Sequence, residues 1–328
     1  MSEARATATQ AHTPVTLEEA EAAARRLDGI AMRTPLLPLA VDTTATLHAK
    51  LEVLQPTGSF KLRGSVNGLM QRPREELADG VWTASAGNMA QGVAWCAREL
   101  GVPATVVVPD NAAEAKLDAL RRLGARIEPV SLDEFFETFT TRERPAMRGR
   151  FIHAFSDHDV MAGNATIGLE ILADMPDVRA IYIPYGGGGL SCGIASVVKQ
   201  LKPDVRIIAC EPAPGASLAA SWRAGTPQTI EFTPSFVDGA GGPYVYPEMF
   251  DLARRLLDDA VAVSLADVAE AIRLLAERAR VVAEGAGALA VAAALRHPRA
   301  EPVACIVSGG NINRSWLTTI LSGGIPAL

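Results

Sequence analysis

The sequence lacks the cysteine and histidine patterns that build disulfide frameworks and zinc sites. Four cysteines stand far apart, at Cys96, Cys192, Cys210 and Cys305. None has CxxC spacing and each lies among apolar or small residues, so we expect buried free thiols. His153 and His158 are five positions apart and do not share a helix face, and no cysteine pair accompanies them. A zinc site is therefore not predicted.

The sequence also lacks an excess of basic residues and any long apolar run. Its net charge is -6 and its pI is about 5.5, so no nucleic-acid partner is expected. No run approaches the roughly 18 apolar residues that would span a membrane. Residues 1–12 contain no apolar segment of the kind found in signal peptides, which predicts a cytoplasmic protein. With 328 residues, 48% of them hydrophobic, the chain is long enough for two domains with substantial cores.

Lysine is scarce, which makes one lysine stand out. The five lysines are Lys50, Lys61, Lys116, Lys199 and Lys202. Only Lys61 lies beside a glycine-rich turn, after a strand-like run over 47–54 and at the start of a predicted helix over 59–70. A lysine amine condenses with aldehydes, and it acts as a base once it is neutral. The alternative interpretation is an ordinary solvated lysine.

Strand and helix patterns alternate along most of the chain. The predicted strands cover 80–84, 104–108, 125–130, 180–184, 205–211, 260–263 and 302–308. The predicted helices cover 89–100, 111–123, 132–141, 165–175, 193–201, 217–224, 265–280 and 287–295. This rhythm predicts an α/β fold with two domains, each a mostly parallel twisted sheet flanked by helices. A charged, irregular linker over 142–150 places the boundary: residues 59–150 form a small inserted domain, and 1–58 with 151–328 form the large domain.

Three further motifs follow predicted strands, at the end where α/β proteins bind ligands. Gly186–Gly189 stand between a strand and a helix, where bare backbone amides suit a phosphate group, although a flexible linker is the alternative. Ser85-Ala86-Gly87-Asn88 opens a helix whose free amides suit a carboxylate. Ser308 ends the last strand. One cleft between the domains is expected to contain these motifs together with Lys61.

Together these motifs resemble the fold-type II pyridoxal-phosphate (PLP) enzymes, specifically the threonine/serine dehydratase branch. The matching segments are Gly58-Ser59-Phe60-Lys61-Leu62-Arg63-Gly64, Ser85–Asn88, Gly186–Gly189 and Ser308-Gly309-Gly310-Asn311, in the family's order. The resemblance runs from about Thr16 to the C-terminus. It implies a fold similar to the β subunit of tryptophan synthase, a PLP cofactor, a small amino-acid substrate and a homodimer.

The resemblance also implies a role for each matching residue. Lys61 would carry the cofactor as a Schiff base and, once freed, remove the substrate's Cα proton. Ser308 would contact the pyridine nitrogen and Asn88 the ring hydroxyl. The implied cofactor-binding residues are Phe60, Lys61, Asn88, Gly186, Gly187, Gly188, Gly189, Leu190, Glu284 and Ser308. The implied substrate-binding residues are Ser85, Ala86, Gly87, Asn88, Asp238 and Gly239.

The sequence departs from the family's pattern at three places. Met89 stands where most relatives have histidine. Ala86 stands where serine racemases have a serine that serves as a second base, which disfavours racemisation because alanine cannot move a proton. Glu211 and Gly215 match a divalent-cation site of many relatives, but Ser217 replaces an expected acidic residue, so a Mg²⁺ or Ca²⁺ site is doubtful.

These observations predict a PLP-dependent carbon–nitrogen lyase. It would convert a β-hydroxy amino acid, L-threonine or L-serine, to a 2-oxo acid and ammonia. The same chemistry on 3-hydroxyaspartate, phenylserine or a hydroxyectoine-derived amino acid stays open, with Met89 and the loop over 235–244 as the places where such a change would appear. A PLP-dependent β-replacement synthase is a second hypothesis. A dinucleotide-binding protein is a third, although no GxGxxG segment follows the first strand.

Overall fold

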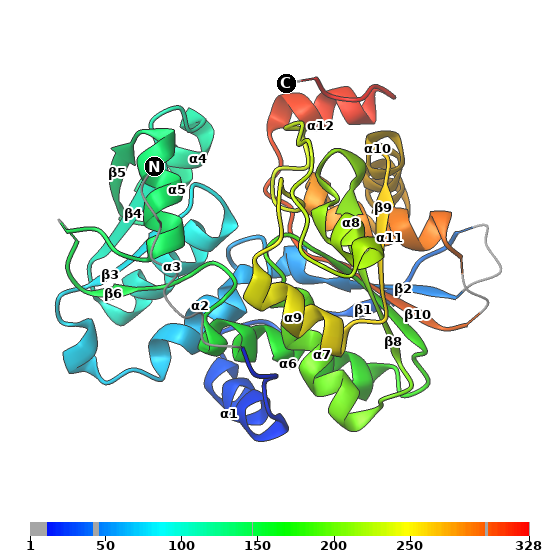
Figure 1. The fold of residues 1–328 in the computed structure, drawn as a ribbon, viewed down its shortest axis with the longest axis horizontal. Helices are drawn as coiled ribbons and strands as arrows, with labels where there is room; N and C mark the ends of the chain where they lie inside the picture. The colour runs from blue at the N-terminus through cyan, green and yellow to red at the C-terminus, as the bar shows by residue number, and fades with distance from the viewer. Residues whose placement is uncertain (1–11, 42–45, 146, 299–300, 328) are drawn as a thin grey trace.

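Two α/β units lie side by side in the computed structural model, each built on a sheet flanked by helices (Figure 1). The structure describes residues 12–41, 46–145, 147–298 and 301–327. Residues 1–11 lie outside these ranges. The prediction that residues 1–12 contain no signal peptide therefore falls almost entirely on residues that the structure does not describe. The predicted fold class is confirmed, because both sheets are mostly parallel and carry helices on their faces.

The larger sheet has six strands in the order β1-β2-β10-β7-β8-β9. Their bounds are β1 (Leu36–Pro38), β2 (Leu47–Leu51), β7 (Ala180–Pro184), β8 (Arg206–Pro212), β9 (Asp259–Val263) and β10 (Val303–Val307). Only β1 runs antiparallel to its neighbour among these strands. The last strand in the chain, β10, therefore lies at the centre of the sheet, between β2 and β7.

Helices cover both faces of the larger sheet, which explains why its strands are apolar on both sides. Ile181 and Ile183 of β7 pack into one core, and Ala180 and Tyr182 pack into the other. The first core is closed by α1 (Leu17–Leu27), α6 (His158–Asp174), α7 (Gly189–Leu201) and α9 (Pro247–Leu256). The second is closed by α10 (Leu265–Leu274), α11 (Gly285–Arg296) and α12 (Arg314–Leu321). Helix α8 (Ser217–Ala224) follows β8 and packs near β9.

The smaller sheet has four parallel strands in the order β5-β4-β3-β6. Its strands are β3 (Val81–Ala84), β4 (Ala104–Pro109), β5 (Arg126–Val130) and β6 (Arg150–Phe151). The helices around it are α2 (Lys61–Met70), α3 (Asn88–Leu100), α4 (Glu114–Arg122) and α5 (Leu132–Thr141). Strand β6 consists of the two residues on either side of the expected domain boundary, and it pairs with β3. Phe151 therefore belongs to the smaller sheet, although the sequence pattern assigns it to the large domain.

Several predicted boundaries are wrong. Helix α6 begins at His158 and not at 165, and the helix expected over 265–280 changes at Leu275 into a π-helical turn that ends at Arg280, in the left-handed region at φ 59°. Helix α9 is not among the helices that the sequence predicts, and it begins at Pro247. Proline is favourable at the first helical position, since its missing N–H has no partner there in any case. Helix α12 is also absent from the prediction.

The prediction of buried free thiols is confirmed for the cysteines. All four are buried free thiols, and burial raises the pKa of Cys192 to about 12. Among the described residues, no helix is long and apolar enough to cross a membrane.

Candidate active site

Lys61 is the first residue of α2 and lines a cavity at the carboxyl end of the larger sheet. Its Nζ donates a hydrogen bond to the carbonyl of Ala154, at 2.6 Å, and lies 5.1 Å from the centre of the Phe60 ring. Burial lowers the pKa of Lys61 to about 8, and the negative charge of Glu284 opposes this shift. The amine is therefore far more available as a nucleophile or base near neutral pH than an exposed lysine is.

The four glycines line the same cavity. They connect β7 to α7, and Gly188 has a φ of 90° that side chains rarely adopt. A Cβ on Gly187 would lie 1.9 Å from the ring of Phe155, and a Cβ on Gly189 would lie 2.4 Å from the Phe155 carbonyl oxygen. Only glycine fits this close approach. Because the free amides at the start of α7 point out of its N-terminus, the turn is suited to hold an anionic group.

Ser308 follows the central strand β10 and is the third feature of this cavity. It is buried, and its carbonyl accepts a hydrogen bond from the backbone amide of Phe60 at 2.9 Å. A bridge between Ser59 and Gly309 continues this pairing. The strand end that carries Ser308 is thus tied directly to the turn that carries Lys61, although about 250 positions separate them in the sequence.

A chain of side-chain hydrogen bonds joins three residues from three parts of the sequence. Asn88 donates to Glu284 at 2.6 Å, and Asn311 donates both to Asn88 at 2.7 Å and to the carbonyl of Thr57 at 2.9 Å. Glu284 is buried, and this burial, with Asp238 nearby, raises its pKa to about 7. The sequence indicated Asn88 and Glu284 separately. It gave Asn311 no role, although Asn311 belongs to one of the matching segments.

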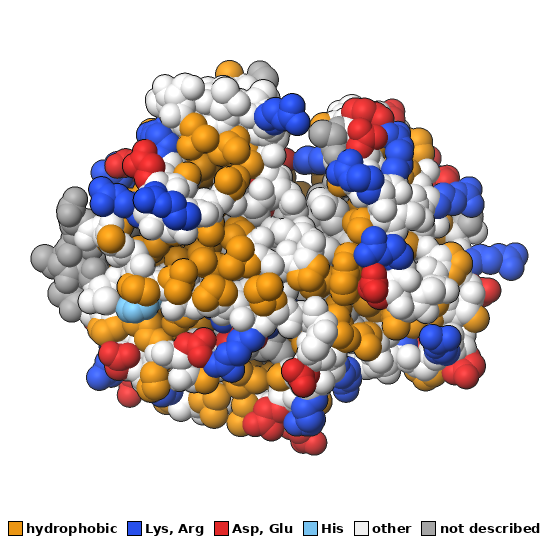
Figure 2. Space-filling model, turned by 180° about the vertical axis from the view of Figure 1, so that it is seen from behind, with side chains coloured by type: hydrophobic (Ala, Val, Ile, Leu, Met, Phe, Trp, Pro, Cys, Tyr) orange, Lys and Arg blue, Asp and Glu red, His pale blue; other side chains and the backbone are white. Residues whose placement is uncertain are grey.

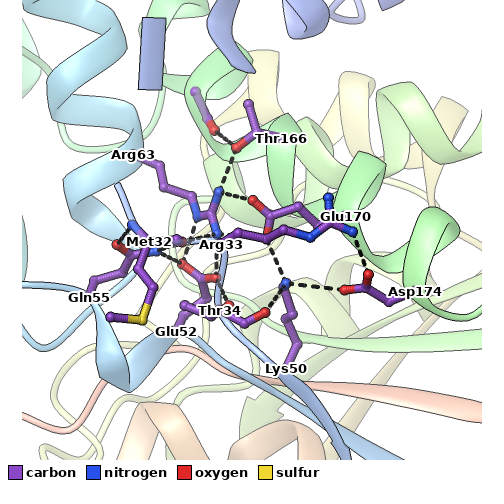
Figure 3. Close-up of polar contacts among 11 residues, drawn as sticks. Met32, Arg33, Thr34, Lys50, Glu52, Gln55, Arg63, Thr166, Glu170 and Asp174 are labelled. Atoms are coloured by element: carbon purple, nitrogen blue, oxygen red, sulfur yellow. Dashed lines mark hydrogen bonds and ion pairs between the residues drawn. The ribbon is translucent and has the colours of Figure 1, made fainter. Parts of the chain in front are cut away.

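A buried network of charges surrounds Arg63, the residue two positions after Lys61 in α2 (Figure 3). Arg63 is 1% exposed and bonds to two carboxylates: Glu52 through Nε and Nη2, and Glu170 through Nη1 and Nη2. Lys50, also fully buried, donates to Glu170 and to the carbonyl of Thr34. Residues two positions apart on a helix point to nearly opposite sides of it. The network therefore anchors the back of α2 while Lys61 faces the cavity.

The predicted substrate residues divide between two places. Gly239 lines the Lys61 cavity, whereas Asp238 lines a neighbouring cavity. Gly87 precedes α3 as its N-cap, and its amide donates to the Ser85 hydroxyl at 3.2 Å. Ala86 is half-buried in the same turn. The expected opening of a helix at this segment is confirmed, while contact with a substrate stays a prediction.

The surroundings of Met89 argue against the expectation that it marks a change of substrate. Its side chain is buried in the core between α2 and α3, where the Ser65 hydroxyl lies 3.7 Å from its sulfur. It is not among the described residues that line either cavity.

Glu211 occupies a helix end in this structure. Its carboxylate accepts hydrogen bonds from the amides of Leu218 (2.9 Å) and Ala219 (2.8 Å), at the start of α8. Burial raises its pKa to about 7. Gly215 lies in the short turn before α8. Among the described residues, no group of three or more Asp, Glu, His or Cys side chains is arranged to hold a metal ion.

Two residues of the cavity, Phe155 and Pro184, were not indicated by the sequence, and a third, Ala240, was indicated only as part of the loop over 235–244. All three line the cavity with the predicted residues. Phe155 packs against His153, whose ring lies 4.5 Å away between centroids, so the loop before α6 forms a wall of the site. No local pattern marks this loop, because its role depends on packing against glycines about 30 positions later.

Comparison with known proteins agrees with this geometry. The sequence profile of the family described as "Pyridoxal-phosphate dependent enzyme" matches residues 27–309. The chain is 39% identical over 318 residues to an L-threonine ammonia-lyase of Thermotoga maritima, covering 95% of this chain and 79% of that protein. Maize serine racemase has a similar structure, with a TM-score of 0.87, 29% identity and coverage of 95% and 98%. The processed form of threonine deaminase isoform 2 from Solanum lycopersicum has a TM-score of 0.83, 31% identity and coverage of 95% and 96%.

The chain therefore belongs to the pyridoxal-phosphate-dependent enzymes, and within them to the threonine dehydratase family of fold type II. Its cofactor is pyridoxal 5′-phosphate. The residues present fit this group: an amine with a lowered pKa stands at one side of the cavity, and a turn of bare amides stands at the other.

Proposed function

We propose that the protein is an ammonia-lyase that converts a β-hydroxy amino acid, L-threonine or L-serine, to a 2-oxo acid and ammonia. One observation carries the proposal: Lys61, Gly186–Gly189 and Ser308 line a single cavity. The names of the relatives support it, since both the Thermotoga maritima protein and the Solanum lycopersicum protein act on threonine by name.

In this proposal the cofactor, when bound, supplies the electron sink for the carbanion that forms at Cα. Lys61 holds the cofactor and takes the Cα proton, for which its lowered pKa suits it. The amides of Gly186–Gly189 and Leu190 bind the phosphate, helped by the N-terminus of α7. Phe60 packs beside the lysine.

Ser308, Asn88 and Glu284 would orient the ring. The Ser308 hydroxyl would contact the pyridine nitrogen without a negative charge, which would favour elimination over transamination. Asn88 would contact the ring hydroxyl, and Glu284 and Asn311 hold the Asn88 amide in one orientation through the bonds described above. The segment Ser85–Asn88, with Asp238 and Gly239, binds the substrate carboxylate and side chain.

The test is a comparison of the parent with Lys61→Ala, using Lys199→Ala as control. Lys199 bonds to Asp258 near the last turn of α7, whereas the cavity lies at the first turn of that helix. We expect Lys61→Ala to lose both the visible absorbance of bound cofactor and ammonia release from L-threonine. Full turnover by Lys61→Ala would disprove the proposal.

The same assay separates the alternatives. Ammonia and 2-oxo acid formed without any added thiol support a lyase, whereas turnover only with a thiol supports β-replacement. A panel that includes 3-hydroxyaspartate, phenylserine and a hydroxyectoine-derived amino acid decides among substrates. The dinucleotide hypothesis is wrong, because the chain belongs to a PLP-dependent family.

We further propose a cytoplasmic homodimer. Each subunit would have a small domain, predicted over residues 59–150 and extended to Phe151 by the pairing of β6 with β3, and a large domain made of residues 1–58 and the rest of the predicted 151–328. The divalent-cation site at Glu211 and Gly215, which the sequence leaves doubtful, is a separate question. Calcium or magnesium titration with Glu211→Gln as control tests it.

A further inference from the structure

A second cavity, of about 290 Å³, lies next to the cavity of Lys61. Its walls come from both units: Lys116 belongs to α4 of the smaller one, and Phe236, Asp238 and Trp316 belong to the larger one. Glu284 lines it as well. Asp238 faces this outer cavity while the next residue, Gly239, faces the inner one. The segment 238–239 therefore stands between the two cavities.

One ion pair crosses the outer cavity. Lys116 Nζ lies 2.7 Å from Asp238 Oδ2, and both side chains are 38% exposed. Farther along the same loop, backbone bonds from Gly241 to Tyr185 and from Gly242 to Gly215 anchor it to the larger unit. The ion pair attaches the Asp238 end of the loop to α4. An exposed pair of this kind adds little to the stability of the fold, so its effect on the cleft can be measured separately.

We propose that the Lys116–Asp238 ion pair is a latch that closes the substrate cleft beyond the β-carbon and so limits the size of the β-substituent. This inference rests on the proposed function. In that function the reacting carbons would lie near Lys61 in the inner cavity, and a longer β-substituent would extend into the outer cavity. Lys116 acts here as a positioning residue, because it holds Asp238 and the adjoining wall of the inner cavity in place.

The electrostatics of Glu284 are consistent with a paired latch. Asp238 raises the pKa of Glu284 and Lys116 lowers it, so the two charges oppose each other at this buried carboxyl. Replacing either Lys116 or Asp238 alone would leave only one of these two charges near the Glu284 carboxyl, which accepts the hydrogen bond from Asn88.

The test is a double-mutant cycle with four variants: Lys116→Ala, Asp238→Ala, the double alanine variant, and the exchanged pair Lys116→Asp with Asp238→Lys. The control is Arg121→Ala on the same helix, because the ion partners of Arg121, Glu114 and Asp118, both lie within α4. kcat and KM are measured for L-threonine and for phenylserine.

For each alanine variant we expect the ratio of kcat/KM for phenylserine to that for threonine to rise at least about threefold. The double variant should show the same rise and not the product of the two, because either change alone removes the pair. The exchanged pair should return the ratio toward that of the parent, and Arg121→Ala should leave it unchanged. Multiplicative effects, an unchanged ratio, or an exchanged pair that behaves like the single variants would overturn the latch.

A second measurement needs no turnover. Hydrogen exchange in the protein without cofactor should become faster over residues 236–240 in both alanine variants and stay unchanged in Arg121→Ala. Equal exchange in all variants would overturn the latch. If the parent forms no 2-oxo acid from any β-hydroxy amino acid, the proposed function fails, and the exchange measurement still decides whether the ion pair holds the loop.

Discussion

At the scale of single residues, two buried ionisable side chains at the Lys61 site have pKa values displaced toward neutrality. Burial lowers the pKa of Lys61 to about 8 and raises that of Glu284 to about 7. Both shifts have the same cause, since burial disfavours whichever form is charged. The site thereby gains groups that exchange protons in the physiological range, and each shift has a consequence for stability.

The Glu284 shift predicts a pH dependence of stability. Because its pKa is raised from 4.5 to about 7, the folded protein keeps a proton that the unfolded chain has released within this range. The free energy of unfolding should therefore fall as pH rises from about 4.5 to about 7, by up to about 3 kcal/mol. Urea unfolding of the cofactor-free protein measures this. In Glu284→Gln, which keeps an acceptor for Asn88, the Glu284 share of that fall should disappear, while the share of Glu211, whose pKa burial also raises to about 7, should remain. An identical slope in both proteins would contradict the assignment.

The glycine turn yields a second prediction at this scale. Gly187→Ala should destabilise the protein by about 1–3 kcal/mol, because the added Cβ would lie 1.9 Å from the Phe155 ring. Gly186→Ala is the matched control for stability, since its Cβ would meet Ala240 at an ordinary 3.4 Å. Thermal unfolding compares the two. In a Phe155→Ala background, Gly187→Ala should cost less than it does in the parent, and an equal cost in both backgrounds would show that the ring is not the obstacle.

At the scale of elements, the charge network of Figure 3 fixes α2 against its neighbours. Arg63 joins the turn after β2, through Glu52, to helix α6, through Glu170. Arg63→Met should cost about 3–5 kcal/mol, because two carboxylates lose their partner in a buried setting. Arg33→Met is the control from the same network, since the Arg33 side chain is 60% exposed where it pairs with Asp174; its cost should stay below about 1 kcal/mol. Urea unfolding measures both losses, and equal values would contradict the network's role.

The order of the helices and strands and most residues that line the Lys61 cavity could be predicted from the sequence. The charge network around Arg63 could not. Alternating periodicity located most strands of the two sheets. Lys61, Gly187 and Ser308 were indicated because turns after strands carry local signals. Arg63, Phe155 and Asn311 gave no such signal of their role, since each acts through partners about 30 to more than 250 positions away or on another element. Helix ends also failed where a π-helical turn or an N-terminal proline replaced the usual signals.

At the scale of the whole molecule, an apolar edge supports the proposed dimer. Strand β1 forms one edge of the larger sheet, and Met32, Leu37 and Leu54 near it are 47%, 41% and 40% exposed. Figure 2 shows a band of hydrophobic side chains across the middle of the face opposite to that of Figure 1. Exposed apolar surface of this kind marks interaction sites.

Sedimentation therefore should show a dimer for the parent and a monomer, or a dimer with dissociation at least about tenfold easier, for Leu37→Glu. The control is Leu321→Glu in α12, which is 51% exposed and lies on a different element. A parent that sediments as a monomer would rule out the proposed assembly, and equal effects of the two variants would place the interface elsewhere.

The central place of β10 bears on how the protein is made. A ribosome releases β2 and β7 long before residues 303–307, so the emerging chain carries two strand edges that have no partner until synthesis is nearly complete. The turn that carries Lys61 is also incomplete until then, because Phe60 pairs with Ser308 and Ser59 pairs with Gly309. Nascent chains stalled before residue 303 should consequently be prone to aggregate and unable to take up cofactor.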